Sequence, residues 1–254
     1  MPRKPSGKGR STKKTGNNRV WLITAIVLAG VLALVIWRKY GPPSQIPKEV
    51  ANYKLMGVDV SKHSGKIKWG NLKSANVGFA YIKATEGVDY VDPLYAQNYK
   101  AAKENGVTVG VYHFFRFAKS GRKQAKHFIK NAKMQKGDLI PVIDVEVWGN
   151  TLSTRSDSEV IIEIGRFLNE LELAVGARPM IYTNKDAFNR FIKGHYENYP
   201  LWFCSLSEIP TADAPRWSFW QYTHKGEIDG APHPVDFNVF RYTRQELKSM
   251  YMLR

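Results

Sequence analysis

The stretch Leu139-Ile140-Pro141-Val142-Ile143-Asp144-Val145-Glu146 decides the fold, because it is apolar nearly to its end and then carries two acids. A short apolar run without polar alternation predicts a strand buried on both faces, as in a parallel sheet. In an extended chain residues i and i+2 point to the same side, so we expect Asp144 and Glu146 to face one cavity with Cα atoms ~6.5–7 Å apart. Burial of two like charges raises the pKa of at least one, and the segment therefore predicts a site for proton transfer.

Seven more runs share this apolar, β-rich character. With residues 139–145 they make about eight strands. The seven runs are residues 55–60, 79–83, 107–114, 179–182, 201–205, 217–222 and 236–240.

Helical periodicity with recognisable ends separates the early strands, over residues 92–106, 120–134, 156–176 and 185–192. Asp92-Pro93 is predicted to cap the first helix, and glycines end the first three. Beyond Tyr199 the strands follow one another over short Gly/Pro-rich connections. The pattern predicts an α/β fold, a (β/α) barrel of about eight strands whose last part has lost its outer helices, with an active site at the C-terminal ends of the strands.

Polar or aromatic residues stand at nearly every predicted strand end. Each alone is typical of a turn or a cap, but together they predict one functional rim. Glycosidic cleavage needs a proton donor beside an ionised carboxylate, which Asp144 and Glu146 can supply. Tyr112, Trp202 and Tyr222 are the aromatics expected to contact a sugar ring. The main residues of this rim are Asp59, Lys83, Glu86, Tyr112, His113, Asp144, Glu146, Tyr182, Trp202, Gln221, Tyr222 and Asp236, and Thr85, Phe114, Asn184, Phe237 and Asn238 stand beside them.

A metal site made of His113, Asp59 and Asp144 is an alternative use of this rim. The six histidines are scattered singly, however, without the spacing of a zinc motif. The sequence also lacks a Gly-rich phosphate loop and a G-x-S-x-G elbow. We therefore predict neither a metal nor a cofactor.

The first part of the chain is predicted to anchor it in a membrane. From Val20 to Trp37 run 18 uncharged residues, which as a helix would span ~27 Å. Seven Lys or Arg precede them without an acid, so residues 1–19 should form a basic cytoplasmic tail. Residues 38–52 would be a linker and residues 53–254 an exported domain, in the periplasm or on the outer face of the cytoplasmic (inner) membrane. A cleaved signal peptide is the alternative, but Arg38-Lys39-Tyr40 stands where small residues should mark the cleavage site.

Charge is concentrated in the same leader. Of the formal +16, residues 1–52 contribute +9, with ten Lys or Arg and one acid, and the other 202 residues contribute +7, with 28 basic and 21 acidic residues. The mildly basic remainder suits an anionic wall polymer, and we predict no nucleic-acid partner. The single cysteine, Cys204, excludes an intrachain disulfide and is expected to be a small buried hydrophobe. The oligomeric state is not predicted.

Five segments, in order and spacing, resemble glycoside hydrolase family 25, the Chalaropsis-type lysozymes. The resemblance covers about Leu55 to Tyr242. It implies a flattened TIM-like barrel of eight strands and five helices that hydrolyses the β-1,4 bond between N-acetylmuramic acid and N-acetylglucosamine in peptidoglycan. The segments are Gly57-Val58-Asp59-Val60-Ser61, Ile82-Lys83-Ala84-Thr85-Glu86-Gly87, Gly110-Val111-Tyr112-His113-Phe114, Asp144-Val145-Glu146 and Val235-Asp236-Phe237-Asn238.

By matching motif, the resemblance makes Glu146 the general acid/base and Asp144 a stabilising carboxylate. Asp59 and Asp236 would complete an acidic floor. Whether Asp144 is a nucleophile, a base for water or a helper to a substrate-assisted step stays open. Two other functions also stay open: a catalytically silent peptidoglycan-binding module and a metal-dependent wall deacetylase.

Overall fold

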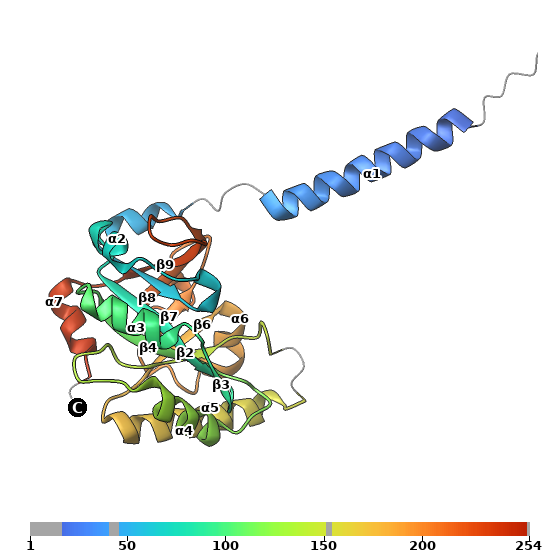
Figure 1. The fold of residues 1–254 in the computed structure, drawn as a ribbon. Helices are drawn as coiled ribbons and strands as arrows, with labels where there is room; N and C mark the ends of the chain where they lie inside the picture. The colour runs from blue at the N-terminus through green and yellow to red at the C-terminus, as the bar shows by residue number, and fades with distance from the viewer. Residues whose placement is uncertain (1–16, 41–45, 151–153, 253–254) are drawn as a thin grey trace, which may run out of the picture. The chain divides into compact units, whose positions relative to one another are not determined.

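The computed structural model describes residues 17–40, 46–150 and 154–252, and within the first helix it describes the side chains of residues 21–32. The chain divides into two compact units, residues 1–43 and 44–254. The first unit contains helix α1 (Asn17–Tyr40), and all other elements belong to the second (Figure 1).

Helix α1 is continuous over 24 residues. Its large apolar side chains between Trp21 and Leu32 are all more than half exposed. Among the side chains that the structure describes, no helix combines the length and apolarity needed to cross a bilayer. The predicted span from Val20 to Trp37 extends beyond residues 21–32 at both ends and so lies partly outside this description. Residues 1–16 of the predicted tail and 41–45 of the linker lie wholly outside it.

The second unit is a closed barrel of eight strands, as predicted. Strand β1 pairs with β2 on one side and with β9 on the other, which closes the ring in the order β1-β2-β4-β5-β6-β7-β8-β9. A two-residue strand, β3 (Tyr90–Val91), pairs with the end of β2. The barrel strands are β1 (Leu55–Val60), β2 (Phe79–Glu86), β4 (Thr108–Phe114), β5 (Val142–Val145), β6 (Met180–Asn184), β7 (Leu201–Cys204), β8 (Trp217–Gly226) and β9 (Val235–Phe240).

The last strand differs from the parallel arrangement expected for the whole barrel. Strand β9 runs antiparallel to both β8 and β1, whereas the other neighbours are parallel. Residues 227–234 are too few for the crossover that a parallel connection needs, so the chain turns back as a hairpin. Asp236 therefore begins its strand at the rim where the parallel strands end, directly opposite Asp59.

The four predicted helices are present, and the sequence signals mark their ends. Ser156 and Glu159 form a capping box at the start of α5, and Gly176 ends it with a left-handed φ of 69°. The helices of this unit are α2 (Trp69–Ser74), α3 (Tyr95–Glu104), α4 (Gly121–Ala132), α5 (Asp157–Val175), α6 (Lys185–Ala187), which continues as a π-helix (Phe188–Ile192), and α7 (Arg244–Leu247). Short 3₁₀ helices cover Lys48–Asn52, Lys62–Ser64, Pro210–Ala212 and Lys248–Met250.

Two details correct the helix expectations. The described helices outnumber the expected five, because short α2 and α7 were not predicted. Helix α3 begins three residues after Asp92, whose carboxylate accepts hydrogen bonds from the backbone N–H groups of Leu94 and Lys62 instead of serving as the N-cap. Helices α4 and α5 pack side by side along one side of the barrel (Figure 1).

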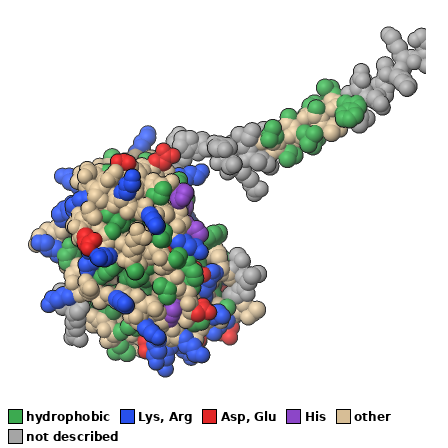
Figure 2. All heavy atoms as spheres, in the orientation of Figure 1, with side chains coloured by type: hydrophobic (Ala, Val, Ile, Leu, Met, Phe, Trp, Pro, Cys, Tyr) green, Lys and Arg blue, Asp and Glu red, His purple; other side chains and the backbone are tan. Residues whose placement is uncertain are grey.

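The core has two layers, one inside the barrel and one between the strands and the helices. Aromatic rings fill the interior; Tyr81 and Trp202, for example, lie 4.9 Å apart between centroids. Gly57 and Gly110 make room for them, since a Cβ at either position would come within 2.4 Å or less of the ring of Phe79 or Tyr81. On the visible outer surface of this unit, Lys and Arg outnumber acids (Figure 2).

Candidate active site

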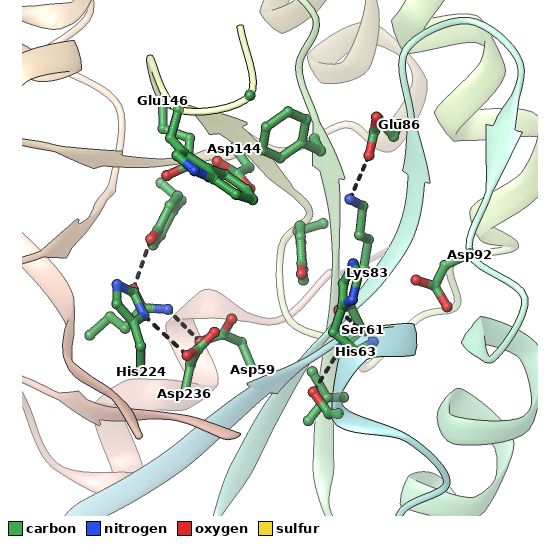
Figure 3. Close-up of a pocket in the computed structure, with 18 of the residues that line it drawn as sticks. Asp59, Ser61, His63, Lys83, Glu86, Asp92, Asp144, Glu146, His224 and Asp236 are labelled. Carbon is green, nitrogen blue, oxygen red and sulfur yellow. Dashed lines mark hydrogen bonds and ion pairs between the residues drawn. The ribbon is translucent and has the colours of Figure 1, made fainter. Parts of the chain in front are cut away.

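A cavity of about 850 Å³ opens at the C-terminal ends of the parallel strands (Figure 3). Alternate residues of each strand point into the barrel, apolar at the closed end and polar at the rim. The cavity is therefore built from the rim ends of all eight strands. Ten of the eleven predicted site residues line it: Asp59, Lys83, Glu86, Tyr112, Asp144, Glu146, Tyr182, Trp202, Gln221 and Asp236.

Tyr222 is the exception, and His113 is also placed elsewhere. Each follows an inward residue, Gln221 or Tyr112, and so points outward by strand alternation. Tyr222 packs in the outer core against Trp220 and Phe237. His113 is fully buried, with Nδ1 2.8 Å from Thr85 Oγ1 and Nε2 3.2 Å from Gln124 Oε1. It cannot join Asp59 and Asp144 around a metal ion.

Asp144 and Glu146 end strand β5 and face the cavity together. Asp144 is 6% exposed, and its Oδ1 is buried without a hydrogen-bond partner in the described part of the chain. Burial, and then the charge of Glu146, raise the pKa of Asp144 well above its usual range. Burial also raises the pKa of Glu146, to about 7, although the cations His224 and Lys83 oppose the rise. The pair therefore keeps a proton near neutral pH.

Asp59 and Asp236 face each other across the β1–β9 pairing. Asp59 Oδ2 accepts hydrogen bonds from Gln221 Nε2 and Asn238 Nδ2, both at 2.8 Å. Burial, and then the charge of Asp236, raise the pKa of Asp59. Tyr182 and Trp202 hold the two amides in place: the Tyr182 hydroxyl donates to Gln221 Oε1 and Trp202 Nε1 donates to Asn238 Oδ1, each at 2.8 Å.

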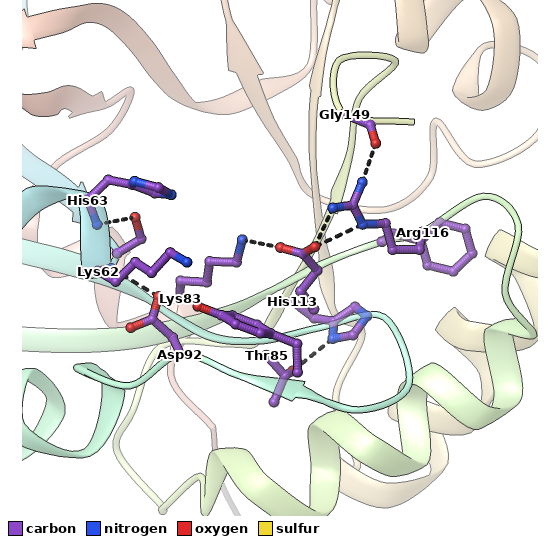
Figure 4. A network of polar contacts seen from close by, with 12 residues as sticks. Lys62, His63, Lys83, Thr85, Asp92, His113, Arg116 and Gly149 are labelled. Atoms are coloured by element: carbon purple, nitrogen blue, oxygen red, sulfur yellow. Dashed lines mark hydrogen bonds and ion pairs between the residues drawn. The ribbon is translucent and has the colours of Figure 1, made fainter. Parts of the chain in front are cut away.

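A chain of charges lines the opposite wall (Figure 4). Lys83 Nζ donates to Glu86 Oε2 at 2.7 Å, and Arg116 Nε donates to Glu86 Oε1 at 2.9 Å. These bonds lower the pKa of Glu86, although burial alone would raise it. Arg116 also donates to the carbonyl oxygen of Gly149, which ties β2 to the loop after β5.

Asn150 holds the loop that carries Glu146. Its Oδ1 accepts from the backbone N–H of Phe117, and its Nδ2 donates to the carbonyl oxygens of Phe115 and Glu146, all at 3.0 Å. Trp148 stands on the same loop, 75% exposed at the cavity rim, where a flat ring can cover a ligand. The sequence pattern assigned no role to Asn150 or Arg116, because neither follows a strand end directly.

The sequence also missed His224, which lines the cavity beside Asp236. In strict alternation from Gln221 it would point outward. The pairing of β8 with β9 shifts register between Gln221 and Thr223, so that one extra residue is inserted and His224 turns inward. Such a bulge depends on the partner strand and leaves no local signal.

Within the residues that the structure describes, no group of three or more His, Cys, Asp or Glu side chains is arranged to hold a metal ion. The polar groups of the cavity are instead coupled carboxyls, amides and tyrosines. They can donate a proton and stabilise a positive centre, and the neighbouring rings can cover a flat ligand.

A closed barrel whose rim holds two buried carboxyls of raised pKa has the groups that a hydrolase working by carboxyl acid–base chemistry needs. The cavity has the proton donor and the aromatic walls that glycoside cleavage uses. The chain belongs to glycosyl hydrolases family 25, whose model matches residues 58–231.

Individual relatives agree with this membership. The solved structure of a family 25 glycosyl hydrolase from Bacillus anthracis is 33% identical, covers 84% of this chain and 100% of its own, and has a TM-score of 0.77. A family GH25 lysozyme from Aspergillus fumigatus is 30% identical over 78% of this chain and 98% of its own, with a TM-score of 0.69. Lysozyme M1 of Streptomyces globisporus is 32% identical over 210 residues, 77% of this chain and 71% of its own.

Proposed function

We propose that this protein is a lysozyme that hydrolyses the β-1,4 bond between N-acetylmuramic acid and N-acetylglucosamine in peptidoglycan. The observation that carries the proposal is the Asp144–Glu146 pair, which shares one buried cavity with the pKa of both carboxyls raised. The names of the relatives, lysozymes and an N,O-diacetylmuramidase of Chalaropsis among them, support this substrate.

Glu146 is the general acid and base. It is the more exposed of the pair, and a pKa of about 7 lets it donate a proton to the leaving oxygen near neutral pH. Asp144 lies deeper and stabilises the positive centre, or the acetamido group beside it. Asp59 and Asp236 form the floor, and Lys83, Glu86, Tyr112, Tyr182, Trp202 and Gln221 bind the glycan.

The direct test is Glu146→Gln in the purified protein, assayed by the loss of turbidity of peptidoglycan. The substitution keeps the size of the side chain and removes its ionisable proton, so we expect activity to fall by about 10³-fold or more. The melting temperature up to neutral pH should stay the same or rise slightly. Glu104→Gln is the matched control, since Glu104 lies exposed on α3 outside the cavity and forms an ion pair with Lys100 at 3.8 Å. Full activity of the Glu146 variant would contradict the assignment.

The products separate this proposal from its alternatives. Mass spectrometry of the released fragments should show new reducing ends on muramic acid. A silent wall-binding module would retain peptidoglycan without releasing fragments. A metal-dependent deacetylase would lose activity with a chelator and leave the glycan strand uncut.

We also propose that the segment from Val20 to Trp37 anchors the enzyme in the cytoplasmic membrane, with residues 1–19 inside and residues 53–254 exported. The support is the uncharged run of 18 residues and the seven cations that precede it. The continuous helix α1 has a length of ~36 Å, which is consistent with a span. An anchored enzyme would act on wall polymer within reach of the membrane.

A further inference from the structure

His224 occupies a position in the cavity that the mechanism above leaves unused. The β-bulge at Tyr222 and Thr223 turns it toward the cavity, between strands β7 and β9 (Figure 3). Bulges beside active sites commonly serve to re-aim a side chain in this way.

Both ring nitrogens of His224 have partners. Nδ1 lies 3.1 Å from Asp236 Oδ1, and Nε2 lies 3.7 Å from Cys204 Sγ. Because the hydrogen bond to Asp236, and then the one to Cys204, favour the protonated ring, the pKa of His224 is raised to about 10. The Asp236 carboxylate beside Nδ1 therefore favours the cationic form of the imidazole at neutral pH. Cys204 is not the buried hydrophobe expected from its sequence but half-buried, with its thiol directed at this ring.

We propose that His224 is a positioning residue of the active site: as an imidazolium held between Cys204 and Asp236, it fixes the Asp236 carboxylate at the cavity wall and places a fixed positive charge near Glu146. The inference rests on the proposed hydrolase function and adds a residue that sets its working pH range.

Several other titratable groups face this part of the cavity, among them Asp144 beside Glu146 on β5 and Tyr182 on β6. Three groups face His224 from neighbouring strands. They are Cys204 on β7, Asp236 on β9 and Glu146 at the end of β5. Asp59 on β1 lies opposite Asp236, and the charge of Lys83 on β2 also lowers the pKa of Glu146. Among the described residues, His224 and Lys83 are the cations whose charges oppose the rise in the pKa of Glu146, and of these two His224 contacts an acid of the floor, Asp236.

The sign of the effect follows from these charges. Burial raises the pKa of Glu146, and the His224 cation lowers it. Replacement of His224 by a neutral residue removes the lowering effect, so Glu146 keeps its proton to a higher pH. The alkaline limb of kcat/KM, which reports the acid form of the free enzyme, must then move to higher pH.

The experiment compares the pH profiles of the full-length wild type and three variants on solubilised peptidoglycan. We expect His224→Gln to move the alkaline midpoint up by about half to one pH unit and to lower the maximal rate about threefold to tenfold, since Asp236 loses its partner. His224→Lys restores a cation and should return the midpoint toward the wild-type value. His195→Gln removes an exposed histidine outside the cavity and should leave the profile unchanged.

A spectroscopic readout keeps the inference separate from activity. NMR titration of labelled histidine should show the His224 ring still protonated well above pH 7, and Asp236→Asn should bring its pKa down. If the ring titrates near 6.5, or if His224→Gln leaves the alkaline midpoint in place, the inference is overturned. If the wild type is inactive but its His224 is protonated, the hydrolase proposal is rejected and the inferred positive charge of His224 still stands.

Discussion

At the scale of single residues, the buried acids of the cavity lower the stability of the fold. Asp144 is buried, and one of its oxygens has no hydrogen-bond partner among the described residues. The raised pKa values of Asp144 and Glu146 mean that the native pair holds a proton that the unfolded chain releases at lower pH. The free energy of unfolding therefore falls as pH rises from the pKa of the carboxyl in the unfolded chain, about 4, toward its higher pKa in the native state. Over this range the native state must either retain the proton or bury a charge.

Asp144→Asn should therefore raise the melting temperature at pH 7.5, where the buried charge is disfavoured, even as it lowers activity. We expect a gain of about 2–4 °C, near 1 kcal/mol, that shrinks toward zero at pH 4. Thermal denaturation at the two pH values measures it. Asp157→Asn is a control of opposite sign, because its hydrogen bonds with Arg190 lower the pKa of Asp157. A melting temperature unchanged at both pH values would show that Asp144 carries no such cost.

The sequence predicted most of the residue-level site. Asp59, Asp144 and Asp236 are inward-facing residues at the rim, and a strand end is legible without a structure. Tyr222 was misplaced because its neighbour Gln221 was assigned to the cavity as well, although adjacent residues of a strand face opposite sides. His224 could not be found, since its inward direction depends on the bulge formed against β9.

At the scale of elements, helices α4 and α5 approach each other closely at Gly121. Gly121, the first residue of α4, lies so near α5 that a Cβ would stand 1.8 Å from the carbonyl oxygen of Glu163. Its N–H also donates to Glu163 Oε2 at 2.6 Å. Only glycine fits this contact without moving a helix.

Gly121→Ala should push α4 away from α5 and destabilise the fold by about 3 kcal/mol, lowering the melting temperature by about 6–12 °C. The matched control is Gly70→Ala in α2, where the new Cβ meets only the end of the Asn105 side chain at 3.2 Å. Differential scanning calorimetry compares the two variants. Equal melting temperatures would mean that the α4–α5 contact adjusts freely.

Elements were predictable where their signal is local. Ser156 and Gly176 mark the ends of α5 in the sequence as they do in the structure. The parallel direction expected for β9 was wrong, because an apolar run has the same pattern in both directions. The length of the preceding connection, residues 227–234, held the only clue.

At the scale of the whole chain, the leader and the barrel carry different chemistry. The leader combines +9 with an apolar run, whereas the barrel unit is mildly basic. The proposed anchor predicts that the full-length protein sediments with membranes and resists extraction by alkaline carbonate. Replacement of Ala25 and Gly30 by arginine within the run should release it, since a charge at the centre of a span costs about 2.5–3.5 kcal/mol. Alanine at Leu22 and Val31 is the matched control. Carbonate extraction of the wild type would contradict the anchor.

The pairing of β1 with β9 joins the two ends of the catalytic unit at its floor. Asp59 is made early, but Asn238, which binds it, and Asp236, which faces it, come from the final strand. A chain still leaving the ribosome or a translocation channel has an open barrel without this floor. The floor of the cavity is thus completed only after β9 has been made, and we expect shorter chains that lack β9 to be inactive.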